Sequence, residues 1–153
     1  RPVAAFSPFP LSDTAREAAE PFRPLAESRG IRYELDIQPG LSLNGDETAI
    51  RELVTILADN AVKYAEDGGW IRIRLASDGR GIRLETANSV AVQPEGDLNR
   101  LFDRFYRADS SRSRKSGGYG IGLSIAKAIV ESHKGRILVR RPDEHSLAFI
   151  VVL

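Results

Sequence analysis

The sequence predicts an α+β fold in which helices cover one face of a single β-sheet, a two-layer α/β sandwich. Several segments alternate apolar and polar residues with a period of two, which is typical of strands that bury one face. Other segments repeat apolar residues every three to four positions, which is typical of helices that bury one stripe. Strands and helices of this kind can all bury their apolar sides when the helices pack together on one face of the sheet.

The composition is that of a single domain without disulfides, thiolate metal sites or membrane helices. The chain has 153 residues, a formal net charge of +1, no cysteine and no methionine. Because the charges nearly balance, nothing global argues for nucleic acid or for an acidic partner. Without cysteine there is neither a disulfide nor a thiolate metal ligand. No apolar run approaches the roughly 20 residues that a membrane helix needs.

The lack of methionine also bears on domain organisation. Because the chain contains no residue that could start translation, we expect it to be a domain of a longer protein. Residues 1–11 are rich in proline, which predicts a linker or an extended edge segment. The folded domain is therefore expected over residues 12–153.

The first helical region is predicted to be interrupted. Thr14, followed three residues later by Glu17, is a capping-box pattern, and apolar residues then recur at helical spacing. Pro21 and Pro24 fall inside this pattern and remove backbone donors. We therefore expect a kink or two short helices that end at Gly30.

The middle of the chain predicts a strand, a helix and two further strands. Residues 31–37 alternate apolar and charged side chains, as a half-buried strand does. A helix is predicted from the N-cap residue Asp46 to about Ala65, with one apolar stripe. Alternating segments at 70–76 and 81–87 predict two strands joined by a short turn.

The last third of the chain predicts two helices and two closing strands. An irregular segment at 90–96 precedes a short helix at 98–106. The inward residues of the short helix are expected to be Leu98, Leu101, Phe102 and Phe105. A longer helix then ends at Gly135 and is expected to bury Ile121, Ile125, Ala128 and Ile129. Strands are predicted at 136–140 and 147–153, and the second is apolar enough to lie inside the sheet.

A glycine-rich stretch runs directly into this longer helix. Gly118, Gly120 and Gly122 alternate with other residues, so that backbone N–H groups there are not covered by side chains. Unpaired N–H groups at a helix start favour an anion such as phosphate. The alternative is an ordinary loop, with Gly122 as a close-packing contact. The polar residues 108–118 cannot form a core and predict a mobile loop.

Three polar residues stand beside the apolar stripe of the second predicted helix. Lys63 and Tyr64 follow Asn60 by three and four positions, which places them on the same side of a helix. A buried asparagine needs partners for its amide, because an unpaired polar group costs on the order of 1 to 3 kcal/mol. A ligand or a neighbouring loop could supply these partners.

Taken together, three motifs in this order resemble the ATP-binding catalytic domain of sensor histidine kinases. They are Glu52–Tyr64 (ELVTILADNAVKY), Leu101–Arg107 (LFDRFYR) and Gly118–Leu123 (GYGIGL). This fold is shared with gyrase-type topoisomerases, certain heat-shock chaperones and mismatch-repair ATPases. The resemblance covers residues 11–153 and implies a mixed, largely antiparallel sheet, the histidine kinase ATPase-like fold.

The resemblance implies ATP and magnesium as cofactors and assigns residues to them. Asn60 is similar to the asparagine whose side-chain oxygen helps to hold magnesium, a cation that prefers oxygen ligands. Lys63 is similar to the lysine near the phosphates, and Tyr64 to the aromatic residue beside adenine or ribose. Phe102 and Phe105 are similar to two phenylalanines that anchor a lid.

The resemblance also implies that the lid itself is residues 108–117. Arg104 and Arg107 could reach the phosphates and are the candidates for a catalytic role. The second glycine box of the family corresponds to Gly118, Gly120, Gly122 and Leu123. Its backbone N–H groups would contact the triphosphate, and its glycines would hinge the lid.

The sequence departs from the family pattern at two places. The first glycine box, D-x-G-x-G at the end of a strand, corresponds here to Asn88, with Val90 and Val92 in place of the glycines. Asparagine can still accept a hydrogen bond from the adenine amino group, so Asn88 is a candidate cofactor-binding residue. Ile56 stands where the family commonly has a second asparagine.

The implied function is transfer of the ATP γ-phosphoryl group to a histidine on a separate dimerisation and phosphotransfer domain, and then to a response regulator. Positioning and charge stabilisation are most of what such a transfer needs. His133 and His145 lack the acidic, proline-followed context of the acceptor, so it is expected elsewhere in the parent protein. We expect a cytoplasmic domain of a membrane-bound kinase, monomeric when isolated.

Two other functions stay open. In the first, the valines at 90 and 92 have closed the pocket, and the domain is a non-catalytic signalling module with weak or no nucleotide binding. In the second, the arginines around residues 100–115 bind nucleic acid. Asp103 and Asp109 interrupt that basic run and no stacking platform accompanies it, so no nucleic-acid partner is expected.

Overall fold

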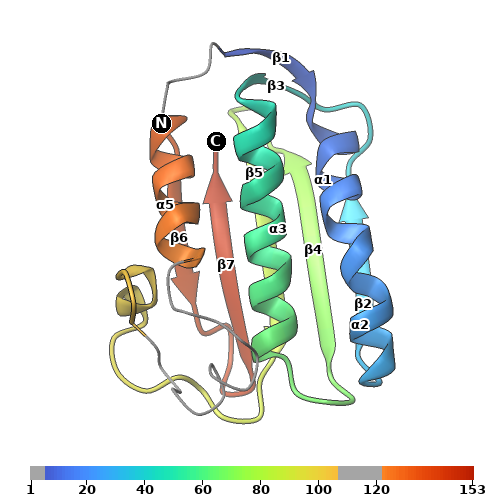
Figure 1. Ribbon diagram of the computed structural model, residues 1–153, viewed down its shortest axis with the longest axis vertical. Helices are drawn as coiled ribbons and strands as arrows, with labels where there is room; N and C mark the ends of the chain where they lie inside the picture. The colour runs from blue at the N-terminus through green and yellow to red at the C-terminus, as the bar shows by residue number, and fades with distance from the viewer. Residues whose placement is uncertain (1–5, 107–121) are drawn as a thin grey trace.

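The computed structural model describes residues 6–106 and 122–153, which form a two-layer α/β sandwich (Figure 1). Helices α1 (Leu11–Ala19), α3 (Glu47–Tyr64) and α5 (Gly122–Ser132) lie side by side on one face of a five-stranded sheet. The strands of this sheet are β2 (Arg32–Ile37), β4 (Trp70–Ser77), β5 (Ile82–Ser89), β6 (Arg136–Arg140) and β7 (Ser146–Val152). The predicted fold class is confirmed.

The sheet is mixed and largely antiparallel, with the strand order β2-β4-β5-β7-β6. Only the β2–β4 pair is parallel among the described strands. The apolar strand β7 lies between β5 and β6, so the prediction of an internal C-terminal strand is confirmed. Its residues Leu147, Phe149 and Val151 are fully buried in the core.

A second, two-stranded sheet lies at one end of the molecule. It pairs β1 (Ser7–Pro10) with β3 (Ser42–Gly45) in antiparallel register. The strand β1 falls in the segment predicted as a linker or edge. The strand β3 was not predicted, because four residues are too few to show a period of two.

Helix α1 begins three residues before the predicted capping box. Its first residue is Leu11, and Thr14 lies inside the helix, where its hydroxyl donates to Glu47 Oε2 at 3.0 Å. The capping-box prediction is therefore wrong. Leu11 is buried in the core, and the Ser12 hydroxyl joins the chain at Gln38 and Leu41, so tertiary contacts fix the earlier start.

The interruption predicted at the prolines is confirmed. A 3₁₀ turn at Glu20–Phe22 separates α1 from α2 (Arg23–Ser28), with Pro21 and Pro24 in the first turns of these two elements. Gly30 then takes a φ of +70°, a conformation that costs glycine little. The chain can therefore turn there from α2 into β2.

Helix α3 follows the sequence prediction closely. The carboxylate of Asp46 accepts a hydrogen bond from the Ala49 N–H at 3.1 Å, as an N-cap residue does. The predicted apolar stripe is buried against the sheet, and the helix ends at Tyr64. This long central helix carries the residues predicted to bind the cofactor.

The short helix at 98–106 is a 3₁₀ turn, η2 (Leu98–Phe102), and it ends before Phe105. Leu98, Leu101 and Phe102 are buried as predicted, but the Phe105 side chain is 65% exposed. Because the helical path stops at Asp103, the spacing that should have turned Phe105 inward is lost. Phe105 has a φ of +67°, which is unusual for a residue with a side chain.

Helix α5 buries a different stripe from the one predicted. The buried residues are Leu123, Ala126, Ile129 and Val130, whereas Ala128 is exposed. Ile125 is only partly buried, and Ile121 lies outside the described residues. Both stripes have helical spacing, so contact with α3 and η2 decides which one faces the core.

The end of α5 also differs from the prediction. Lys134, not Gly135, takes the left-handed conformation, with a φ of +58°. Gly135 is needed for another reason, because a Cβ there would collide with the Val152 carbonyl oxygen. In residues 6–106 and 122–153, no helix has the length and apolar character needed to cross a membrane.

Candidate functional site

Several predicted site residues come together at one end of the sandwich. Figure 1 places the C-terminal end of α3, the end of β5 and the loop that follows it at the bottom of the view, with the start of α5 higher up beside α3. The turn between β6 and β7 lies at the same end. Side chains from distant parts of the sequence can therefore act on one ligand there.

Asn60 is the most informative residue of this group. Its Nδ2 atom is buried and finds no hydrogen-bond partner within residues 6–106 and 122–153. An unsatisfied buried donor costs on the order of 1 to 3 kcal/mol, so such groups call for an explanation. The neighbouring-loop alternative considered for this amide gains no support from the described residues.

The other two polar residues of α3 lie one turn further along. Lys63 Nζ contacts Asp59 Oδ2 at 3.0 Å, an ion pair across one helical turn. Such a pair on a partly exposed face contributes little to stability. Tyr64 is half-buried and packs against the core.

The start of α5 meets α3 one turn before Asn60. A Cβ added to Gly122 would lie 3.5 Å from Cγ2 of Ile56, which is ordinary contact. Leu123 is buried beside it. Because Ile56 and Asn60 are four residues apart on one helix face, the predicted hinge residue Gly122 lies next to the predicted magnesium residue.

Asn88 occupies the helix-covered face of the sheet at the end of β5. It is 1% exposed, and its Nδ2 donates to the Ser89 carbonyl at 2.9 Å. Leu84 and Thr86 precede it on the same face by the two-residue period of a strand. Thr86 is a second buried polar residue on this face, and it is not among the site residues predicted from the sequence.

The residues near the predicted lid are only partly described. The Arg104 guanidinium lies 5.0 Å from the centre of the exposed Phe105 ring. Phe102 is buried and meets Phe149 edge-on, with ring centres 5.9 Å apart. Of the phenylalanines predicted as anchors, only Phe102 is therefore anchored in the core. Arg107, Gly118, Gly120 and the predicted lid at 108–117 lie outside the described residues.

A preformed metal site is absent from the part of the chain that is described. No group of three or more His, Cys, Asp or Glu side chains there could hold an ion. A single amide oxygen such as that of Asn60 fits magnesium only if phosphate oxygens and water supply the other ligands. The residues present therefore fit a magnesium ion that arrives with a nucleotide.

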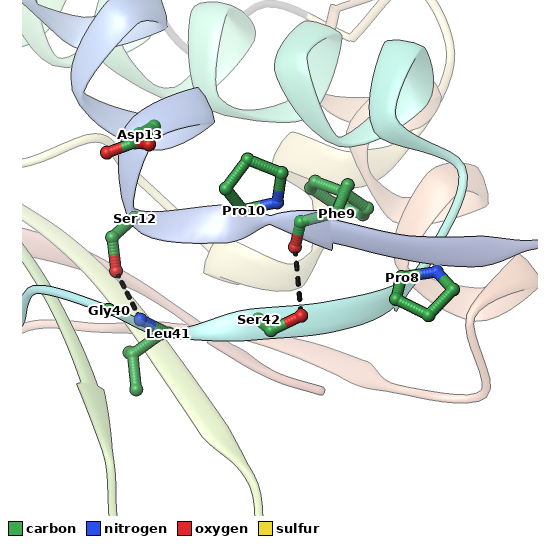
Figure 2. A pocket seen from close by; sticks show the side chains of 8 residues that line it. All are labelled: Pro8, Phe9, Pro10, Ser12, Asp13, Gly40, Leu41 and Ser42. Atoms are coloured by element: carbon green, nitrogen blue, oxygen red, sulfur yellow. Dashed lines mark hydrogen bonds between the residues drawn. The ribbon is translucent and has the colours of Figure 1, made fainter.

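A separate surface hollow lies away from these residues. Figure 2 shows it between β1, β3 and the first turn of α1, lined by Pro8, Phe9, Pro10, Ser12, Asp13, Gly40, Leu41 and Ser42. Hydrogen bonds from Leu41 N–H to the Ser12 hydroxyl and from Ser42 to the Phe9 carbonyl cross it. None of the predicted site residues lines it.

A comparison of sequences then identifies the family. The sequence model for histidine kinase-, DNA gyrase B-, and HSP90-like ATPases matches residues 45–153. The chain belongs to this family. The match begins just before the Asp46 cap of α3 and includes every residue of the candidate site, which agrees with the resemblance seen in the sequence.

Curated relatives of this ATPase domain are sensor kinases. The chain is 34% identical to the signal transduction histidine-protein kinase BaeS of Escherichia coli K12 over 132 residues, or 86% of this chain. It is 35% identical to the sensor histidine kinase CusS of the same strain over 144 residues, or 94% of this chain. These alignments span only 28% and 29% of BaeS and CusS. The chain thus corresponds to less than a third of either relative.

Solved structures show the same fold. The catalytic domain of the histidine kinase ThkA, in a nucleotide-free form, aligns with a TM-score of 0.83 and 24% identity, covering 98% of this chain and 95% of that one. The full-length kinase ShkA in complex with AMPPNP aligns with a TM-score of 0.76 and 22% identity, covering 99% of this chain and 31% of ShkA. At these identities the likeness concerns the fold alone.

Proposed function

We propose that this chain is the ATP-binding catalytic domain of a sensor histidine kinase. The observation that carries the proposal is the match of residues 45–153 to the ATPase family. Within that match, the buried Nδ2 of Asn60 has no acceptor among the described residues and lies one turn from the α5 contact at Gly122, so the side chain has capacity for a ligand. Relatives of this chain are named histidine kinases, which favours phosphoryl transfer over the other activities of the family.

The residues of α3 and β5 would share the work of holding the nucleotide. Asn60 would ligate magnesium through its oxygen, while Lys63 would leave Asp59 for the phosphates. Tyr64 and Asn88 would contact the adenosine. When bound, magnesium would neutralise phosphate charge. The first residues of α5 and the glycine-rich stretch predicted before it would offer backbone N–H groups to the same phosphates.

The acceptor would lie in another domain of the parent protein. In the transfer, an imidazole nitrogen forms a bond to the γ-phosphorus, the bond to the bridging oxygen breaks, and ADP leaves. His133 is half-buried and its Nε2 already accepts the Asp46 N–H, so we do not propose it as that acceptor. A dimerisation and phosphotransfer domain would supply the acceptor, and a response regulator would receive the group next. We place the domain in the cytoplasm, as part of a membrane-bound kinase.

The test is calorimetric titration of ATP and ADP into the domain, with and without magnesium. We expect magnesium-dependent binding in the wild type, and at least about tenfold weaker binding in Asn60→Ala, since one lost charge-linked contact is worth at least about 1.4 kcal/mol. Thr55→Ala is the matched control, because Thr55 is exposed on the same helix and its hydroxyl bonds only to Arg51 in the described chain.

A urea titration should accompany each variant. Removing an unsatisfied buried donor should leave the ligand-free Asn60→Ala domain within about 1 kcal/mol of the wild type, which would show that any lost affinity is not lost folding. No binding to the wild type at millimolar nucleotide would refute the proposal and favour the non-catalytic signalling module.

A further inference from the structure

The loop at residues 90–96 contains two positions at which the family resemblance predicts glycine. It follows β5 directly, and Val90 and Val92 stand at the two glycine positions. Of residues 90–96, all of them described, only Gly96 has a positive φ, at +78°. The loop thus reaches its path with ordinary backbone angles, and such an irregular segment needs contacts from outside to keep one conformation.

Those contacts come from the turn between β6 and β7. The Val90 N–H donates to the His145 carbonyl at 2.8 Å. The Gln93 amide nitrogen donates to the carbonyl of Asp143 in that turn at 3.0 Å and to the carbonyl of Ser146, the first residue of β7, at 2.6 Å. Both hydrogens of that amide are therefore used to hold the loop.

Arg141 holds the far end of the loop. Its Nη2 atom donates to the Pro94 carbonyl at 2.8 Å and to the Gly96 carbonyl at 3.1 Å. Hydrogen bonds from a charged donor are stronger than neutral ones. Two residues, Gln93 and Arg141, thus fix both halves of a loop that is separated from the turn by about 50 positions in sequence.

The turn is itself well fixed, so it can serve as an anchor. Asp143 Oδ1 accepts hydrogen bonds from the His145 N–H at 2.8 Å and from the Ser146 hydroxyl at 3.0 Å. These bonds, the backbone one first, hold the pKa of Asp143 below its usual value. Ser146 is buried and pairs with Ser89 in the sheet, next to Asn88.

The loop also carries an unused acceptor. Gln93 Oε1 is enclosed, and no described residue donates to it. A buried amide oxygen without a donor is costly, so the contacts at Nε2 keep the side chain in place despite that cost. Since Val90 follows Asn88 by two positions, a loop fixed by these contacts has a defined position next to the predicted base-binding residue.

We propose that the β6–β7 turn positions loop 90–96 for nucleotide binding, through Gln93 and Arg141, at the place where glycines would otherwise shape the loop. Gln93 and Arg141 are thus positioning residues for the base-binding side of the site near Asn88. This inference rests on the proposed function, because it concerns the affinity and base selectivity of that same site.

The test compares Arg141→Ala and Gln93→Met with Arg140→Ala. Arg140 is the neighbouring residue of the same hairpin, is exposed, and pairs with no described side chain. Arg140→Ala therefore removes one positive charge, as Arg141→Ala does, without removing a contact to the loop. Calorimetry with Mg-ATP and Mg-GTP gives affinity and base selectivity. Amide hydrogen exchange over residues 90–96, without nucleotide, reports on the loop itself.

We expect Arg141→Ala to bind Mg-ATP about tenfold more weakly, the factor that corresponds to the loss of one good hydrogen bond, and to lose selectivity for ATP over GTP. Exchange in the loop should rise in the same variant. Arg141→Lys should restore part of the affinity and part of the protection from exchange. Arg140→Ala should behave as the wild type. Gln93→Met leaves Arg141 in place and should show the same direction if Arg141→Ala does not fold.

The outcomes separate this inference from the proposed function. If the wild type binds ATP and both variants keep its affinity and selectivity, the positioning role is refuted and the kinase proposal stands. If hydrogen exchange in the loop rises in the variants but affinity and base selectivity do not change, the contacts of Gln93 and Arg141 have a structural role only. The inference is then likewise refuted. If the wild type itself binds no nucleotide, both proposals fail, and the wild-type titration alone reveals it.

Discussion

His133 connects three segments through one imidazole ring. Its Nε2 accepts the Asp46 N–H at 3.0 Å, and its Nδ1 lies 2.9 Å from the Ile129 carbonyl. The ring also stacks on Phe6, with centres 4.5 Å apart. Through these contacts His133 joins the end of α5 to the start of α3 and to Phe6.

The contribution of His133 can be measured against the other histidine. His133→Ala leaves the Asp46 N–H without its acceptor and removes the stacking on Phe6, so it should lower the free energy of unfolding by about 1 to 3 kcal/mol. His145→Ala changes an exposed side chain and should stay within about 0.5 kcal/mol of the wild type. Urea titration measures both, and equal losses would contradict the assigned role.

Between elements, a buried phenol joins the end of α1 to β2. The Tyr33 hydroxyl donates to the Ala19 carbonyl at 2.6 Å, and the Arg23 guanidinium lies 5.3 Å from the centre of the Tyr33 ring. Burial raises the pKa of Tyr33 well above its ordinary value of 10.0, and the nearby Arg23 opposes that rise only partly. The folded domain therefore prefers the neutral phenol.

This preference makes stability depend on alkaline pH in a defined direction. Because the folded pKa is raised, the stabilisation is fully present below pH 10 and is lost as the pH rises above it. Tyr33→Phe should cost about 1 kcal/mol at neutral pH through the lost hydrogen bond, and that difference from the wild type should shrink above pH 10. Urea titrations from pH 7 to about pH 11 measure it. A constant difference across this range would be the contrary result.

For the whole molecule, the open face of the sheet bears on its association state. That face carries ion pairs such as Arg32–Glu34, Arg74–Asp36 and Arg83–Glu85. The edge strands β2 and β6 also carry charged residues, which oppose pairing with another sheet. The described surface thus offers no broad apolar sheet face on which a second copy would bury its own.

We therefore predict that the isolated domain is a monomer. Sedimentation equilibrium at micromolar concentration should give one species near 16.8 kDa, and moderate salt should not change it, because surface ion pairs contribute little. A concentration-dependent dimer mass would overturn this prediction. Such a dimer would have to form through a surface other than the charged face of the sheet.

Much of the candidate site could be predicted from the sequence because its residues lie on one strongly patterned helix. The cap at Asp46 and the stripe of α3 define that helix locally, and the register then places Asn60 and Lys63 on one side. The contact of Ile56 with Gly122 could not be predicted in this way, because it joins residues about 65 positions apart and depends on how α5 packs. The hydrogen bonds from Gln93 and Arg141 that fix loop 90–96 also join residues far apart in sequence.

The sequence by itself determined the fold class, the break at Pro21 and Pro24 and the internal place of β7, because each follows from local spacing, backbone chemistry or apolar content. The family followed from the resemblance of three motifs to known proteins. The tertiary structure alone decided the start of α1 at Leu11, the stripe that α5 buries, the exposure of Phe105 and the pairing of β3 with β1. In each of these cases the sequence allowed more than one local arrangement with similar spacing. Contacts with distant parts of the chain select among these arrangements, as the Ser12 hydroxyl does for α1 through Gln38 and Leu41.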